Sequence, residues 1–224
     1  MFRLWERWGP SLGVFAVVLW VIAFVISDGS PDSTDSNAKI QAWYESSSNQ
    51  NSQIVGFFVF VIGVLCVIAF FGALRERLAD AEDQPARISQ LAFGAGLLSA
   101  ALAGLAVIFF TVPAFTASDS SAADVAPATF RMVQNAGYMT WVVGGMIGAI
   151  TVWASAAISL RHGVFPRWFG WVSVLVGVVQ LFAVFFFPIL LFWLWIATAS
   201  ALLTWRRPAS PETAITPPPA RQAL

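Results

Sequence analysis

Charged side chains are scarce in this sequence of 224 residues. They make up 11% of the chain, less than half of the roughly 25% that is usual for a soluble domain. Twelve Lys and Arg balance twelve Asp and Glu, whereas a nucleic-acid-binding protein would carry a basic excess. Hydrophobic residues make up 58%, and the mean hydropathy is +0.74. This composition excludes a disordered chain, a nucleic-acid binder and a soluble enzyme.

Cysteine and histidine are almost absent, with one residue of each, Cys66 and His162. A single cysteine cannot form an internal disulfide, and two such residues do not make a metal cluster. We therefore predict no metal and no cofactor. Cys66 stands in the run VLCVIAF and is expected to be a small apolar packing residue. His162 is expected to be a polar residue at the membrane interface.

Six long stretches contain no charged residue at all. They are 17 to 23 residues long and cover 10–27, 54–74, 91–112, 138–160, 168–187 and 189–205. A helix needs about 20 residues to cross a hydrocarbon core of about 30 Å. The sequence therefore predicts an all-α fold: a polytopic membrane bundle of six transmembrane helices over residues 1–205. A disordered, Pro-rich cytoplasmic tail is expected over 206–224.

The last two stretches need a separate argument because no polar loop divides them. From Trp168 to Trp205 the chain is free of charge for 38 residues, which would be about 57 Å long as one helix. This segment must fold back, and Pro188 is the expected break, because proline removes a backbone donor and clashes with the preceding turn. The alternative is one kinked and tilted helix, which would put the C-terminus on the opposite side.

The distribution of basic residues favours the folded-back segment. With six spans and an internal N-terminus, the inner segments carry ten basic residues and the outer segments only two, Lys39 and Arg131. This is the asymmetry of the positive-inside rule, and five spans would weaken it. We predict that both termini are cytoplasmic and that the protein is a multi-pass protein of a bacterial plasma membrane. The first apolar stretch lacks a cleavage site for a signal peptide and is expected to remain as a span.

The first outer loop, 28–53, allows two interpretations. It either forms a short interfacial helix, with N-cap candidates from Ser33 to Asp35, or it is a solvated linker. In the helical alternative, Ile40, Trp43 and Tyr44 would face the lipid surface.

The spans hold few polar residues. Thr151, Ser155 and Gln180 are the candidates for a ligand-binding or polar packing cluster. Small residues at helical spacing lie in the third span at Gly96, Ala100 and Gly104, and in the fourth at Gly144 and Gly148. Such spacing lets two helix backbones approach closely. We expect the third and fourth helices to pack along these residues; a polar-lined cavity for a neutral ligand is the alternative.

No catalytic constellation can be built from the spans. An ionisable residue at membrane depth would be the ordinary sign of a function there, and the six stretches contain none. An enzyme would have to use His162 or the acids Asp28, Asp32 and Asp35 outside them. We therefore predict a protein without enzymatic activity.

Two runs of residues carry a resemblance. FFGALRERL and GVFPRWFGWVSVLVGV resemble an uncharacterised family of six-helix integral membrane proteins common in actinobacteria. Phe169 stands where that family usually has leucine. The resemblance implies the topology and no activity. The residues Pro166, Arg167, Trp168 and Trp171 form an expected interfacial anchor, with the proline in the first turn of the fifth helix and the tryptophans at headgroup level.

Two functions remain open at this point. The first is a non-enzymatic structural or regulatory membrane component that acts through helix or partner contacts. The second is a carrier or binding protein for a small lipophilic or neutral molecule. The expected partners are the lipid bilayer and either another protein or a second copy of the chain, but no nucleic acid.

Overall fold

The fold is helical throughout the part of the chain that the computed structural model describes, residues 8–83 and 85–205. Within these ranges there are seven α-helices and no strand, so the predicted all-α class is confirmed. The elements are η1 Gly9–Ser11, α2 Leu12–Ile26, α3 Asn37–Tyr44, α4 Ser47–Ala81, α5 Arg87–Asp119, η2 Ala122–Asp124, α6 Pro127–His162, α7 Arg167–Gln180, η3 Ala183–Phe185 and α8 Phe187–Trp205. The expected disordered tail, 206–224, lies outside the described residues.

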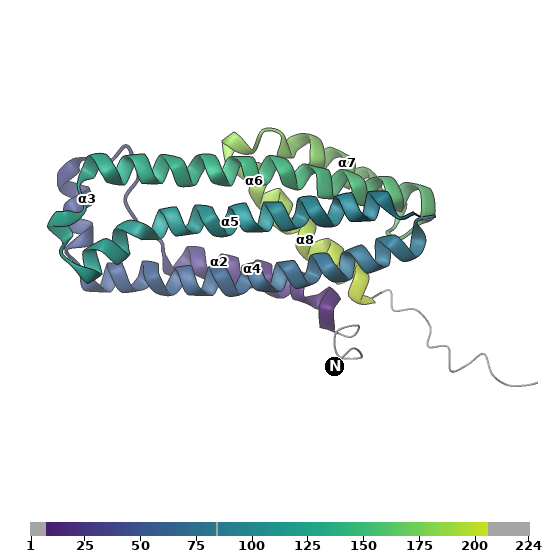
Figure 1. The fold of residues 1–224 in the computed structure, drawn as a ribbon, viewed down its shortest axis with the longest axis horizontal. Coiled ribbons are helices and arrows are strands. Elements are labelled where there is room, and N and C mark those ends of the chain that lie inside the picture. The colour runs from purple at the N-terminus through teal and green to yellow at the C-terminus, as the bar shows by residue number, and fades with distance from the viewer. Residues whose placement is uncertain (1–7, 84, 206–224) are drawn as a thin grey trace, which may run out of the picture.

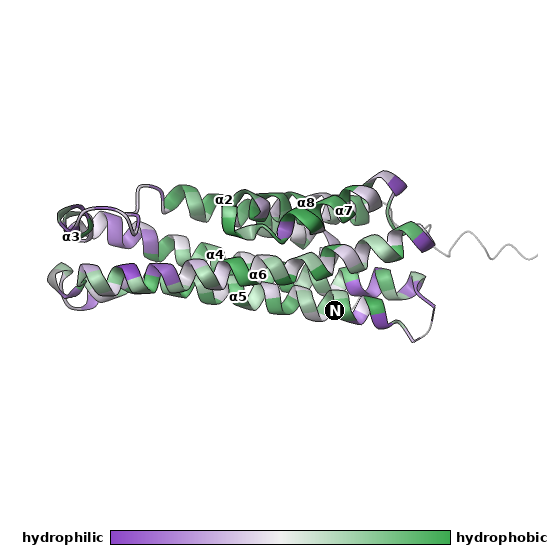
Figure 2. Cartoon of the chain, turned by 90° about the horizontal axis from the view of Figure 1, so that it is seen from above, coloured by the Kyte–Doolittle hydropathy of each residue, from purple (hydrophilic) through white to green (hydrophobic). Residues whose placement is uncertain are grey.

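Five helical segments are long and apolar enough to cross a membrane: Gly9–Ile26, α4, α5, α6 and α8. Side chains along them are apolar on the faces that meet other helices and on the faces that do not, as expected of helices surrounded by lipid. Figure 2 shows the hydrophobic residues gathered along the middle of the bundle and the hydrophilic ones at its two ends. The chain is thus a membrane-spanning protein.

The helices pack in two layers of unequal length. In Figure 1 the long helices α4, α5 and α6 lie side by side and extend at one end beyond α2, α7 and α8. Helices α2, α7 and α8 lie together over the other end, with α2 packed on α4 and α7 on α6. The short helix α3 covers the extended ends of the long helices. Both ends of the described chain lie toward the end of the bundle that is away from α3.

Aromatic side chains fill the centre of the bundle. Trp20, Phe60, Trp141 and Trp193 are all at least 93% buried, and their rings lie 5.1 to 6.5 Å apart. The indole N–H of Trp20 donates to the Phe60 carbonyl across α2 and α4. Rings at such distances stabilise a core beyond the area they bury. Trp195 of α8 is buried as well.

The chain reverses between α7 and α8, but not where the sequence predicted. Helix α7 ends at Gln180, so the continuous helix predicted over 168–187 is wrong, and the turn comes before Pro188. Pro188 instead occupies the first turn of α8, where its missing N–H is not needed. The reversal packs on Gly145 of α6: a Cβ there would come within 3.0 Å of the Ala183 Cβ. A bare glycine on a neighbouring helix thus makes room for the turn.

The outer loop does contain a helix, but its apolar face is turned inward. Ile40 and Tyr44 of α3 are fully buried in a small hydrophobic cluster with residues of α5 and α6, so the expectation that they face lipid is wrong. The N-cap is Ser36, whose hydroxyl accepts from the Lys39 N–H, and not a residue of the expected range 33–35. Because α4, α5 and α6 extend beyond the charge-free stretches, α3 has a protein surface to pack on.

The loop between α4 and α5, at the end of the bundle away from α3, is short and contains a helix cap. The carboxylate of Glu82 accepts from the backbone N–H groups of Ile88 and Ser89, both at 2.8 Å, and so caps the first turn of α5. Burial raises the pKa of Glu82, but these two backbone bonds, together with the Ser89 side chain and the charge of His162, lower it by more, and the pKa lies below its ordinary value. A capping carboxylate also complements the positive end of the helix dipole.

The predicted interfacial anchor surrounds the start of α7. Pro166 is the N-cap and so precedes the first turn, one position earlier than predicted. Arg167 begins the helix, and Trp168 and Trp171 are more than half exposed. Phe169, which replaces the leucine usual in the resembling family, is buried and stacks on Trp195 with ring centroids 6.0 Å apart.

Candidate ligand-binding site

The polar residues singled out in the spans are used for helix packing. The Thr151 hydroxyl donates to the Ala92 carbonyl of α5 at 3.0 Å, and the Ser155 hydroxyl donates to the Thr151 carbonyl one turn back. Gln180 of α7 donates through its amide to the Gly145 carbonyl of α6 at 3.2 Å, while its side-chain oxygen is buried without a partner among the described residues. All three side chains are buried, and each is tied to a helix backbone.

The small residues bring helices together, though not all between the predicted pair. A Cβ at Gly144 would come within 3.4 Å of the Ser99 carbonyl, so α5 and α6 do approach closely there. Gly148 lies against Phe192 of α8 and the Ser99 hydroxyl. Gly96 and Gly104 face Phe71 and Val64 of α4 instead of α6. Ala100 is buried in the main hydrophobic core.

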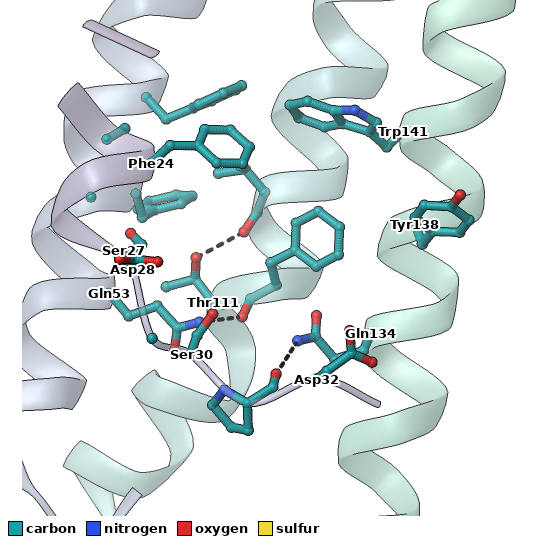
Figure 3. Close-up of a pocket in the computed structure, with 18 of the residues that line it drawn as sticks. Phe24, Ser27, Asp28, Ser30, Asp32, Gln53, Thr111, Gln134, Tyr138 and Trp141 are labelled. Atoms are coloured by element: carbon teal, nitrogen blue, oxygen red, sulfur yellow. Dashed lines mark hydrogen bonds between the residues drawn. The ribbon is translucent and has the colours of Figure 1, made fainter. Parts of the chain in front are cut away.

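A cavity of about 600 Å³ opens elsewhere, where the apolar part of the bundle meets the extended polar ends of the long helices. Its walls come from α2, α4, α5 and α6, with Phe186 from the α7–α8 reversal. Figure 3 shows Phe24 on one side and Tyr138 and Trp141 on the other. This volume lies in the range of pockets that hold small organic ligands, about 300–1,000 Å³. None of Thr151, Ser155 and Gln180 is among the described residues that line it.

The inner wall of the cavity is aromatic. The ring of Trp141 lies 5.7 Å from that of Phe60, 6.4 Å from that of Phe110 and 6.2 Å from that of Phe24. Phe186 lies 6.2 Å from Phe24 and borders the cavity as well. Such a wall presents a large apolar surface and the faces of several π-systems to anything inside.

The outer part of the cavity is polar, and three of its side chains donate to backbone carbonyls. The amide of Gln53 donates to the Phe110 carbonyl at 3.1 Å, and the Thr111 hydroxyl donates to the Val107 carbonyl at 2.8 Å. The Tyr138 hydroxyl donates to the carbonyl of Val184 in the α7–α8 reversal. Two of these bonds are drawn in Figure 3. These donors are engaged with backbone carbonyls and are not free for a ligand.

One acceptor at the same level has no partner. The amide N–H of Gln134 donates to the Pro31 carbonyl at 3.4 Å, while its side-chain oxygen is buried with no hydrogen-bond partner among the described residues. A buried acceptor without a partner has a free-energy cost of about 1–3 kcal/mol. A donor on a bound molecule would remove this cost.

A segment that we call the strap, residues 28–36, crosses the mouth of the cavity between α2 and α3. Arg131 of α6 holds it through three hydrogen bonds of 2.8 to 2.9 Å, to the carbonyls of Ser33 and Asp35 and to the side-chain oxygen of Asn37. Within the strap, the Asp32 carboxylate accepts from the Thr34 N–H at 3.0 Å. This backbone bond, with one from the Ser33 hydroxyl, lowers the pKa of Asp32.

The charge at the mouth is acidic. Asp28 and Asp32 line the cavity, and no Lys, Arg or His is among the described residues that do. The ion pair found among the described residues joins Lys39 to Asp35 at 2.8 Å, so neither lining carboxylate is paired with a basic side chain. The cavity therefore combines an aromatic interior with a negatively charged, acceptor-rich mouth.

The two alternatives for an enzymatic site, His162 or the acids of the outer loop, lie far apart. His162 is the last residue of α6 and is exposed, whereas Asp28, Asp32 and Asp35 lie near the opposite end of the bundle. In the described ranges, no group of three or more His, Cys, Asp or Glu residues could hold a metal ion. The four do not form one catalytic site.

The cavity was not predicted from the sequence, although the sequence carries a trace of it. Gln53, Thr111 and Gln134 all stand at or just beyond the outer ends of charge-free stretches, and aromatic residues follow on the membrane side. Their common level could be inferred from the predicted topology. That their side chains converge on one space follows only from how the helices are rotated.

Comparison with known proteins identifies the family. The family model described as "Domain of unknown function (DUF4386)" matches residues 11–206, and the chain belongs to this family. The expectation of an uncharacterised family is thereby confirmed. No curated protein and no solved structure matches the chain.

Proposed function

We propose that the protein is a membrane-embedded binding protein, or carrier, for a small amphipathic molecule. The observation that carries the proposal is the cavity of about 600 Å³, whose aromatic interior lies at membrane depth and whose mouth is polar. A molecule with an apolar body and one polar end would place each part against matching surface. This is the second of the two functions left open by the sequence, but its site is this cavity and not the predicted cluster around Gln180.

The proposal includes six crossings with both ends cytoplasmic. Helix α7 and η3 together are about 27 Å long. The Tyr138–Val184 bond supports this proposal, because residue 138 begins the charge-free stretch of α6 and the bond joins it to the reversal. Apart from Arg131, the described arginines gather at the end of the bundle away from α3; they are Arg75, Arg77, Arg87, Arg161 and Arg167. The positive-inside rule makes that end cytoplasmic, in the plasma membrane of a bacterium.

The proposed function includes no catalytic activity. Among the described residues that line the cavity, the Ser33 hydroxyl donates to the Asp32 carboxylate on the strap, and no histidine or lysine is present to act as a further base.

Native mass spectrometry tests the proposal. The protein is extracted in a mild uncharged detergent, and we expect a retained mass of a few hundred daltons. Asn135→Trp, at the cavity mouth, should abolish the retained mass by filling the entrance. Met132→Trp is the matched control, because this exposed residue of the same helix does not line the cavity.

Other outcomes would overturn the proposal. A bare chain, a second copy or a bound protein partner, with no small molecule at any detergent concentration, would favour the structural or regulatory function instead. Equal retention in both tryptophan variants would place any ligand outside this cavity.

A further inference from the structure

We infer that the cavity selects an organic cation with a compact apolar body, such as a protonated amine. The inference rests on the proposed function, since it names the class of ligand for the same cavity. It comes from the charged side chains at the mouth and from the hydrogen-bonding groups there that have no partner. These groups determine the sign of the charge that a ligand can carry.

The first step concerns charge. Asp28 and Asp32 line the mouth, and the two basic side chains bonded there, Arg131 and Lys39, direct their donors to oxygens of the strap and of Asn37. A carboxylate or phosphate on the ligand would meet two like charges and no cation among the described lining residues. A cation would meet two opposite charges. The mouth therefore disfavours anions and attracts cations, most strongly at low ionic strength.

The second step concerns hydrogen bonds. The donors of Gln53, Thr111 and Tyr138 are occupied by backbone carbonyls. Among the described residues that line the cavity, the indole N–H of Trp141 is a buried donor without a partner, and the side-chain oxygen of Gln134 is a buried acceptor without one. A ligand that brings N–H groups satisfies this acceptor, whereas a ligand that brings only acceptors leaves it unpaired. A protonated amine supplies both the N–H groups and the charge.

The third step concerns the apolar body. Phe24, Phe60, Phe110 and Trp141 surround the inner part of the cavity. Their ring faces attract a cation as well as an apolar group, and Trp is the strongest of them in this respect. A cation at the mouth therefore loses less on entry than it would in a cavity lined by aliphatic side chains.

The test uses three probes with the same apolar cage and different polar ends: adamantyl amine, adamantyl alcohol and adamantyl carboxylate. Their binding to the full chain in uncharged detergent is measured by titration calorimetry at pH 7, with empty micelles subtracted. An alkyl amine is protonated at this pH. We expect the amine to bind roughly fivefold more tightly than the alcohol, and the carboxylate more weakly than either.

A pair of double variants assigns the effect to the mouth. Asp28→Asn with Asp32→Asn removes both lining charges but keeps the oxygen that accepts from the Thr34 N–H, and should reduce the amine to the affinity of the alcohol. Asp119→Asn with Asp124→Asn makes the same change in net charge at the same end of the molecule. Neither residue lines the cavity, and this control should keep the preference for the amine.

The outcomes separate the two proposals. If all three probes bind equally, the cation assignment is wrong while the binding function stands. If the preference for the amine survives the Asp28/Asp32 change, its attribution to the carboxylates of the mouth is wrong. If no probe binds beyond empty micelles and the native protein also retains no small molecule, both proposals fail. Loss of the preference in the Asp28/Asp32 variant alone is the result that supports the assignment.

Discussion

The Arg131 clamp is the contact whose removal tests the geometry of the cavity mouth most directly. Its guanidinium makes three hydrogen bonds to the strap and to Asn37, at 2.8 to 2.9 Å. A hydrogen bond to a charged group typically stabilises by about 1.5–3 kcal/mol. The three bonds share one partly exposed side chain, so we assign about 2–3 kcal/mol to the whole clamp.

The perturbation is Arg131→Ala, and the observable is hydrogen exchange of the strap amides. Within the strap, the Thr34 N–H donates to the Asp32 carboxylate and the Asp35 N–H donates to the Asp32 carbonyl, at 3.0 and 3.1 Å. These amides exchange when the strap opens. Loss of the clamp should speed their exchange roughly 30- to 150-fold, since about 1.4 kcal/mol corresponds to a factor of ten.

Lys39→Ala is the matched control, because it removes a basic side chain that is also bonded to the strap. The Lys39 side chain is 61% exposed, and it bonds only to the Asp35 carboxylate. An exposed pair of this kind contributes about 0.2–1 kcal/mol, so exchange should change by less than about fivefold. The reasoning would be refuted if Arg131→Ala left strap exchange within twofold of the native rate, or if Lys39→Ala had as large an effect.

Three further predictions test packing, capping and the place of the site. Gly177→Ala should destabilise the protein by about 1–3 kcal/mol, because its Cβ would clash with the indole ring of Trp153. Gly94 lies in open space, so Gly94→Ala should instead raise the thermal midpoint in detergent, since alanine stabilises a helix by about 0.5–1 kcal/mol over glycine. The pKa of Glu82 is lowered on folding. The stability that this carboxylate contributes is therefore present above its ordinary pKa of 4.5 and is lost as the pH falls through the pKa of the folded protein. Glu82→Gln should lower the free energy of unfolding by about 1 kcal/mol at pH 7 and flatten its pH dependence, and an unchanged pH profile of unfolding would contradict the cap. Gln180→Leu should lower stability through the lost bond to α6 yet leave the affinity of the adamantyl probes unchanged, and a loss of affinity equal to that of the mouth variants would return the site to the predicted polar cluster.

The sequence predicted the membrane helices well because one physical rule governs them. In hydrocarbon every backbone N–H and C=O must be satisfied within the segment, so a charge-free stretch of about 20 residues becomes a helix whatever its side chains. The stretches 54–74, 91–112 and 138–160 therefore lie inside α4, α5 and α6. The stretch 168–187 ends early, since Gly145, on another helix, makes room for the turn.

Side-chain placement was harder to predict for a related reason. In a soluble helix the polar side marks the surface, but here both the lipid and the neighbouring helices favour apolar residues, so hydropathy does not distinguish the two faces. Gly96 and Gly144 show this: the same small-residue spacing faces α4 in one helix and α5 in the other. Outside the membrane, Ile40 and Tyr44 pack on protein instead of lipid because the long helices continue past the bilayer.

The amino-acid sequence by itself determined that this chain spans a membrane as a helical bundle, because backbone hydrogen bonding and the cost of burying charge act locally along each segment. Only the tertiary structure decided where a ligand would be held. A cavity forms where helices of unequal length leave a space that side chains do not fill, and the rotation of α2, α4, α5 and α6 that turns Phe24, Gln53, Thr111 and Trp141 toward that space depends on contacts among segments far apart in the chain.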